Sequence, residues 1–265
     1  MVTDPLAGEG SGGGAGHSRR GPGGWPFVGV DLTGGRRPSD LAALDRGARR
    51  ATFARALTDD DLLRALEGFK ARIVAIDSPM GLPAGLCCLE ESCLCAPSRP
   101  GTGRSAEREL AKLGIACFWT TKRSIIKAMV YRAIALKARL EVEGYVVLEV
   151  FPYAVKRILL GRPLPKKNSP EGVARLVQGV SELLPRCRWP EGWDPDHDQL
   201  DALFCAVTAR MYSLGETESL GEADEVPLVI PRASSRPYVT PSPQPSPRGR
   251  GGGRVSPQPF SPLAV

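Results

Sequence analysis

The sequence lacks any apolar run approaching the ~20 residues that a membrane-spanning helix needs, so we expect no membrane contact. Residues 1–24 also lack the apolar segment of a secretory signal. We therefore expect a cytoplasmic protein, in which the seven cysteines are reduced or bound to metal. Hydrophobic residues make up 42% and charged residues 24% of the chain, which is typical of a soluble globular protein.

The two ends of the chain lack the residues that build a hydrophobic core. Residues 1–24 are rich in Gly, Ser and Pro, and residues 233–265 are dominated by Pro, Ser, Gly and Arg, so we predict that both are disordered. The folded domain is expected over residues 25–232. Acids are absent from residues 233–265, whose arginines supply most of the net charge of +6, so this charge alone says little about a nucleic-acid partner.

The order of apolar runs and turn residues predicts the fold class. Strands are expected at 27–32, 40–44 and 51–56 as an antiparallel meander, and buried strands at 72–76 and 145–150. Helices are expected from residue 59 and at 105–113, 124–143, 170–184 and 197–214, with a last strand at 226–230. A meander followed by strand–helix alternation predicts an α/β mixed sheet flanked by helices.

Acidic residues occur where such a sheet would form a site. Asp31 and Asp77 end two strands, Glu149 lies near the end of a third, and Asp198 and Asp201 share one face of a helix start. Because ligands gather at the carboxyl ends of strands in open α/β sheets, these acids are expected to converge. Carboxylate oxygens suit Mg²⁺ or Mn²⁺, and such ions can hold and hydrolyse a phosphodiester.

Each of these residues also has a simpler interpretation. An Asp after an apolar strand is often a turn former, and Asp198 fits a helix cap. Glu149 is harder to explain in this way, because an acid within VVLEVF would be buried without a partner. His197 is a candidate base, proton shuttle or hydrogen-bond donor, although a His at a helix start is more often structural.

Several segments together resemble a known family. They are VGVDLTGG (28–35), IVAIDSPMGLP (73–83), VVLEVFPYAVKRILLG (146–161), PKK (165–167) and HDQLDALFCAVTAR (197–210). They resemble an uncharacterised family of predicted nucleases, a domain of unknown function assigned the ribonuclease H-like fold. Asp-x-x-Asp-Ala-Leu at 198–203 also resembles the last motif of Holliday-junction resolvases, which share that fold.

The resemblance implies a ribonuclease H-like fold over nearly all of residues 25–232 and a nuclease activity. It implies that the divalent metal ligands are Asp31, Asp77, Asp198 and Asp201. Glu149 belongs to the motif of the nuclease family itself, and the resemblance assigns it no role.

A cysteine-rich segment, GLCCLEESCLC, follows the Asp77 loop. Its four thiols could ligate one tetrahedral Zn²⁺, although the spacing CC-x₄-C-x-C is not a common zinc-finger pattern. A compact loop with buried or redox-active thiols is the alternative, and an iron–sulfur centre is a third. The cysteines concerned are Cys87, Cys88, Cys93 and Cys95.

Basic and aromatic side chains gather on both sides of the expected helix at 105–113 and at the PKK segment. They are candidates for phosphate contacts and base stacking. The alternative is a solvated helix face with core aromatics. The residues are Arg104, Arg108, Lys122, Arg123, Trp119, Lys166 and Lys167.

These observations predict a metal-dependent nuclease that acts on nucleic acid, without choosing between DNA and RNA. One alternative is a non-catalytic nucleic-acid or protein binding module on the same fold. Another is a phosphotransferase or ATPase of the wider superfamily, which needs two Gly-rich phosphate-binding hairpins and a duplicated domain. Thr33-Gly34-Gly35 is a single weak candidate for such a hairpin.

Overall fold

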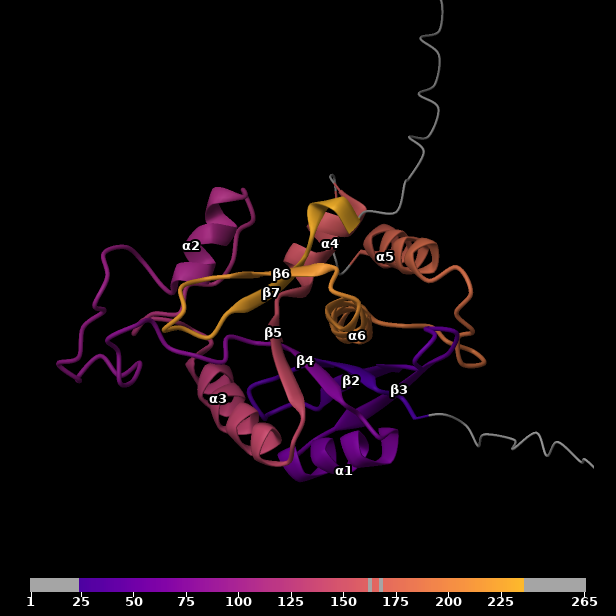
Figure 1. Cartoon of the computed structure of the whole chain (residues 1–265), viewed down its shortest axis with the longest axis horizontal. Coiled ribbons are helices and arrows are strands. Elements are labelled where there is room, and N and C mark those ends of the chain that lie inside the picture. Colours follow the sequence, from indigo (N-terminus) through magenta and orange to yellow (C-terminus); the bar gives the residue numbers. More distant parts are fainter. Residues whose placement is uncertain (1–23, 162–163, 167–168, 236–265) are drawn as a thin grey trace, which may run out of the picture.

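The protein forms one mixed sheet with helices on both faces (Figure 1). The computed structural model describes residues 24–161, 164–166 and 169–235. The strand order is β3-β2-β1-β4-β5-β7-β6. The strands are β1 (Phe27–Asp31), β2 (Ser39–Leu44), β3 (Ala51–Ala56), β4 (Ile73–Asp77), β5 (Val146–Val150), β6 (Thr217–Leu220) and β7 (Leu228–Pro231).

Strands β1 to β3 form an antiparallel meander, β4, β5 and β7 run parallel to β1, and β6 is an antiparallel edge strand. The α-helices are α1 (Asp59–Phe69), α2 (Ser105–Lys112), α3 (Lys127–Val142), α4 (Pro152–Leu160), α5 (Pro170–Leu183) and α6 (His197–Ser213). This is the α/β mixed sheet that the order of elements predicted, with an antiparallel meander, strand–helix alternation and flanking helices, so the predicted fold class is confirmed in these respects.

Two elements differ from the sequence-based expectation. Helix α4 begins at Pro152, in a stretch for which the sequence predicted no helix. Proline suits the first helical turn, because an N–H group at that position would have no acceptor within the helix. The apolar residues that follow Pro152 continue the helix. Strand β6 was also not expected, because it is only four residues long and its side chains are largely exposed, so it shows no apolar run.

The sheet separates two hydrophobic layers. Alternate residues of β1 point to opposite faces: Val28 and Val30 pack with α1 and α3, whereas Phe27 packs with α4, α5 and α6. In Figure 1 helices α1 and α3 lie below the sheet, and α4, α5 and α6 lie above it. This alternation decides which strand-end carboxylates can meet one another.

Helix α6 is buried along most of its length and lies close to β1. A Cβ atom on Gly29 would stand 2.0 Å from the carbonyl oxygen of Ala202 and 2.2 Å from the backbone nitrogen of Ala206. Only glycine on the strand, opposite small residues on the helix, permits this approach. The close contact brings the N-terminal turns of α6 to the carboxyl ends of β1 and β4.

The disorder predicted for the two ends of the chain stays a prediction. The predicted disorder of 1–24 and 233–265 falls outside the described residues, except for Gly24 and a short 3₁₀ helix at Ala233–Ser235.

In the described part of the chain, no helix combines the length and the apolar character needed to cross a membrane.

Candidate functional site

Two aspartates meet because the strands that carry them are neighbours in register. Asp31 is the last residue of β1 and Asp77 is the last residue of β4, and the parallel pairing sets them side by side. Asp31 lies two residues after Gly29 and therefore points to the same face of the sheet, and its parallel partner Asp77 points to that face too. Both side chains thus lie on the face covered by α6.

Asp201 comes to these two from the second turn of α6. Carboxylate oxygens of Asp31, Asp77 and Asp201 all lie within 4.8 Å of one another. Asp201 is buried and the other two are half-buried. The structure therefore brings together three of the five acids that the sequence nominated.

A buried lysine is part of this cluster. The ammonium of Lys156, on α4, forms an ion pair with Asp201 and lies 5.5 Å from the ring centre of Phe204. Both members of the pair are more than nine-tenths buried. The sequence suggested Lys156 only as a phosphate contact, and its pairing with Asp201 was not foreseen because helix α4 was not predicted.

The cluster also affects its neighbour Cys205. Burial raises the pKa of this thiol well above its usual range, and the carboxylates of Asp77, Asp31 and Asp201 raise it further. Cys205 lies one helical turn after Asp201 and is completely buried. It therefore stays a neutral thiol beside the acids.

His197 and Asp198 lie at the start of α6, beside Asp201. His197 Nδ1 is 2.7 Å from Asp198 Oδ1, and the three residues can bring ligand atoms within 4.8 Å of one another. Asp198 does not cap the helix, because Asp196 accepts hydrogen bonds from the backbone N–H groups of Asp198 and Gln199. Asp201 thus belongs to two groups, one with Asp31 and Asp77 and one with His197 and Asp198.

Asp40 is a further acid on the same face. It is the β2 partner of Asp31 and is buried, with Arg55 Nε donating to its carboxylate at 2.8 Å. Burial raises the pKa of Asp40 although Arg55 acts against this, and the nearby charges of Asp196 and Asp198 raise it further. Its position in SDLAAL resembled an ordinary strand start, which is why the sequence gave no signal.

Glu149 does not join the aspartates, contrary to expectation. Its strand partner in β4 is Ile76 and not Asp77, so its side chain lies on the opposite face of the sheet. There both of its oxygens accept from the guanidinium of Arg104, and one accepts from the backbone N–H of Met80 at 2.7 Å. Burial raises the pKa of Glu149 and the charge of Arg104 opposes that rise.

The prediction that Arg104 contacts nucleic acid is therefore wrong. It is almost fully buried and also donates through Nε to Glu107 at 3.1 Å. Glu107 in turn accepts from the backbone N–H of Thr120 at 2.9 Å. A guanidinium occupied in this way cannot reach a phosphate without breaking the buried network.

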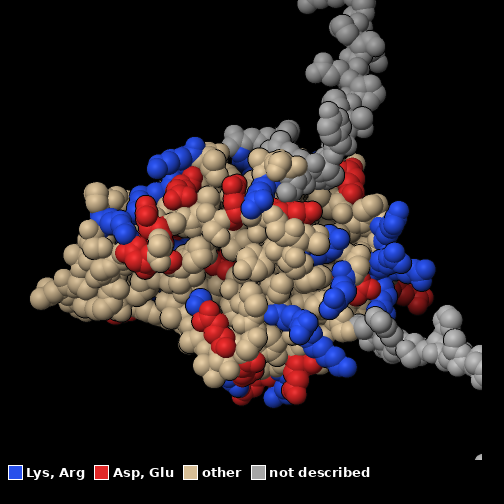
Figure 2. Space-filling view, in the orientation of Figure 1, with Lys and Arg blue, Asp and Glu red and all other residues tan. Residues whose placement is uncertain are grey.

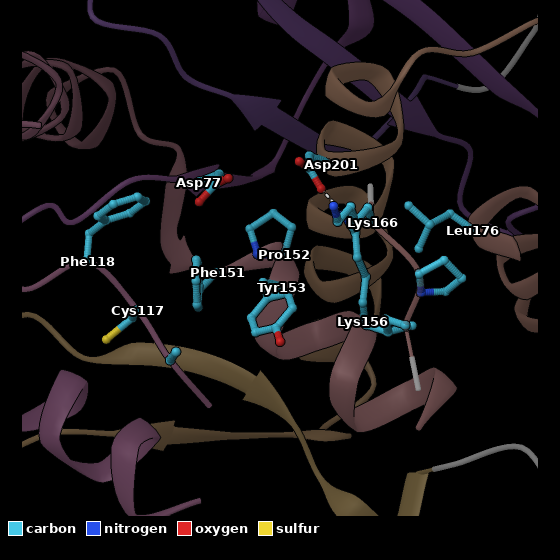
Figure 3. A pocket seen from close by; sticks show the side chains of 13 residues that line it. Asp77, Cys117, Phe118, Phe151, Pro152, Tyr153, Lys156, Lys166, Leu176 and Asp201 are labelled. Carbon is cyan, nitrogen blue, oxygen red and sulfur yellow. Dashed lines mark hydrogen bonds and ion pairs between the residues drawn. The ribbon is translucent and has the colours of Figure 1, made fainter. Parts of the chain in front are cut away.

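A cavity of about 610 Å³ opens beside Asp77 and Asp201. Figure 3 shows these two carboxylates at its upper edge, with Phe151 and Tyr153 below them and Phe118 to one side. Phe118 is 62% exposed and Tyr153 is 38% exposed. Exposed Lys166 and buried Lys156 add positive charge to the lining.

The other predicted nucleic-acid contacts are dispersed. The Arg108 guanidinium donates to the carbonyl of Gly103, Lys122 to that of Cys93, and exposed Arg123 lies 3.7 Å from Glu91. Trp119 is half-buried and packs beside Gly103. Lys166 alone of these residues lines the cavity, and Lys167 lies outside the described residues.

The four cysteines of the GLCCLEESCLC segment converge. Their sulfur atoms lie within 4.8 Å of one another, and those of Cys87 and Cys93 are 3.5 Å apart. Hydrogen bonds with the backbone of Cys87 and Cys88 lower the pKa of the Cys95 thiol to about 6. The pKa of the Cys87 thiol is instead raised to about 12, mainly by its hydrogen bond with Cys93.

Comparison with known proteins identifies a family. Among solved structures, the Thermus thermophilus RuvC structure is similar at 18% identity with a TM-score of 0.37, over 76% of this chain and 98% of that chain. No curated protein matches the chain. The family described as Protein of unknown function (DUF429) matches residues 29–226, a span that holds all three clustered aspartates. The chain therefore belongs to the DUF429 family.

Proposed function

We propose that this protein is a metal-dependent nuclease that hydrolyses phosphodiester bonds. The observation that carries the proposal is the convergence of Asp31, Asp77 and Asp201 from β1, β4 and α6. Three carboxylates this close repel one another unless cations offset their charge. Their position at the carboxyl ends of parallel strands is where open α/β sheets bind ligands.

The donor set fits a hard divalent ion. Mg²⁺ and Mn²⁺ prefer carboxylate oxygens, and Asp31, Asp77 and Asp201 would hold the ion. A bound ion of this kind polarises a phosphoryl oxygen and lowers the pKa of bound water. The ammonium of Lys156 on Asp201 indicates that the cluster already accepts positive charge.

We assign the adjoining cavity to the nucleic-acid substrate. Its volume of about 610 Å³ is within the usual range for small ligand sites, so it has room for a nucleotide unit. Phe118 and Tyr153 offer exposed rings for base stacking, and Lys166 offers a charge for a phosphate. His197 is our candidate for proton transfer, supported by its half-buried position beside Asp198 and Asp201.

A cleavage assay on the full chain tests the proposal. Fluorescent single-stranded, duplex, hybrid and branched substrates, of DNA and of RNA, are incubated with Mg²⁺, Mn²⁺ or EDTA. We expect metal-dependent cleavage that falls by about 100-fold or more in Asp77→Asn, because even the partners of metal ligands usually contribute 10- to 100-fold.

Asp60→Asn is the matched control, since Asp60 is an exposed carboxylate on α1 that pairs with Arg139 on the opposite face of the sheet. It should leave cleavage unchanged. Equal loss in both variants, or cleavage that survives EDTA, would contradict a metal site at Asp77. Binding of nucleic acid without cleavage of any substrate would favour the non-catalytic module.

The phosphotransferase alternative has less support. The described residues form a single sheet, with no duplicated domain among them. Thr33-Gly34-Gly35 is a local turn, in which Thr33 Oγ1 donates to the carbonyl of Arg37 at 2.6 Å and accepts from the N–H of Gly35. We therefore retain the nuclease as the function to test first.

A further inference from the structure

The outer part of the segment between β4 and α2 has no buried side chain of its own to hold it in place. The whole segment covers residues 78–104 without a helix or strand and projects at the left of Figure 1. None of residues 90–102 is buried, and Leu94 is completely exposed. Loops of this length without secondary structure are uncommon in compact domains, and a segment without a core needs another source of stability.

The four cysteines lie where the segment folds back on itself. The backbone N–H of Cys93 donates to the carbonyl of Glu90 at 3.2 Å, and this turn returns Cys93 to Cys87. Cys95 then approaches Cys88, with its sulfur 3.7 Å from that residue's carbonyl oxygen. The adjacent thiols of Cys87 and Cys88 therefore face those of Cys93 and Cys95 on the returning half of the loop.

The separation of the sulfurs matches ligation of a single ion. Two sulfurs on a tetrahedral zinc with bonds of about 2.3 Å lie about 3.8 Å apart. All four sulfurs here lie within 4.8 Å, and the Cys87–Cys93 pair is at 3.5 Å. A disulfide would need about 2.05 Å. A cluster of several iron atoms would separate its cysteine ligands farther than one ion does.

The surroundings suit a fixed structural centre. The backbone N–H of buried Leu89 donates to Tyr131 Oη at 2.6 Å, and this hydroxyl donates to Glu90 at 3.0 Å. The ammonium of Lys122 donates to the carbonyl of Cys93 and so brings a positive charge to a group of thiols. Helix α3 and the segment before it thus hold both ends of the cysteine turn.

We propose that Cys87, Cys88, Cys93 and Cys95 bind one structural Zn²⁺ that holds the segment between β4 and α2. Four protein thiolates fill the tetrahedral coordination of zinc and leave no open position for a substrate, which separates this centre from the carboxylate site. The proposal does not depend on nuclease activity.

The test measures metal directly on the full chain. Elemental analysis after purification without chelators should give about one zinc per chain, as a closed four-cysteine site predicts. Replacement by Co²⁺ should give the intense visible and near-ultraviolet bands of tetrahedral thiolate coordination. Cys93→Ser should lose the metal. Cys187→Ser should retain it, because Cys187 packs against the core beside α5 and α6, near Arg188 and Asp45.

The outcomes separate this site from the aspartates and from disulfides. Asp77→Asn should keep the zinc, and loss of zinc in that variant but not in Cys93→Ser would overturn the proposal. Mass spectrometry that finds two disulfides within residues 87–95 and no zinc would also overturn it. If Cys93→Ser does not fold, the Co²⁺ spectrum of the unaltered chain still decides whether thiolates bind the metal.

Discussion

Gly29 of β1 and Ala202 of α6 are in direct backbone contact, and this contact sets the distance between the helix and the sheet. A Cβ on Gly29 would meet the Ala202 carbonyl oxygen at 2.0 Å. Asp31 lies two residues after Gly29 and Asp201 lies directly before Ala202. The spacing of the two carboxylates therefore depends on the absence of a single side chain.

Gly29→Ala should lower both stability and activity. Overpacking usually costs about 1–3 kcal/mol, and we expect about 3 kcal/mol or more here because the contacts are backbone atoms that cannot rotate away. Urea denaturation measures the free energy of unfolding. Gly68→Ala on α1 is the control, since its Cβ meets nothing within 4 Å and a helical Gly costs about 0.5–1 kcal/mol relative to Ala. Equal stability of Gly29→Ala and the parent would show that α6 can move outward at little cost.

Glu149→Gln should destabilise the fold without a direct effect on phosphodiester cleavage. Gln keeps the shape and the hydrogen bond from Met80, but leaves the buried Arg104 charge with one partner fewer. Removing one member of a buried ion pair typically costs about 3–5 kcal/mol. Chemical denaturation measures this loss, and exposed Glu141→Gln should change stability by no more than about 0.5 kcal/mol.

The triple variant Arg104→Met/Glu107→Gln/Glu149→Leu makes the assignment sharper. Because it removes all three charges of the buried network, it should be more stable than Glu149→Gln, which leaves Arg104 and Glu107 charged. A Glu149→Gln protein with unchanged stability and lost cleavage would instead give Glu149 a catalytic role.

The contrast between Asp77 and Glu149 shows what the sequence could predict. Both residues lie near the ends of buried strands, and the strands themselves were predicted to within a residue at each end. Whether the side chains meet depends on register, and the pairing sets Asp77 opposite Val150 and Glu149 opposite Ile76. A period of two reverses the face with each residue, so strand ends known to within one residue cannot decide it.

The role of Arg104 could not be read from local charge. Arg104 stands among several basic residues and resembled part of a surface patch. Its partner Glu149 is 45 positions away in the sequence, and no local pattern encodes that pairing. Lys156 and Asp201 are separated by the same number of positions. The convergence of Asp31 and Asp77, in contrast, follows from the parallel pairing of two strands that the sequence did predict.

Lys156→Met should strengthen metal binding while it weakens the metal-free fold. The ammonium lies on Asp201 and repels a divalent ion at the same carboxylates. We expect the dissociation constant for Mn²⁺ to fall by about ten-fold or more, which corresponds to about 1.4 kcal/mol. Calorimetric titration measures it, and Lys137→Met on α3, whose ammonium pairs with Glu141, is the control. Weaker Mn²⁺ binding in Lys156→Met would show that the lysine supports the metal-loaded site.

Phe118→Ala should weaken nucleic-acid binding through lost stacking. Stacking of a base on an aromatic ring contributes about 1–3 kcal/mol, so we expect affinity for single-stranded oligonucleotides to fall by about 5- to 150-fold. Fluorescence anisotropy in EDTA measures binding without cleavage. Tyr212→Ala removes another exposed ring, on α6 and away from the cavity, and should have no effect. Salt dependence distinguishes the two kinds of contact in the cavity. Lys166→Ala should reduce the slope of log affinity against log salt by about one, whereas Phe118→Ala should leave the slope unchanged. A Phe118→Ala protein with normal affinity would mean that the substrate lies elsewhere along the carboxylate edge.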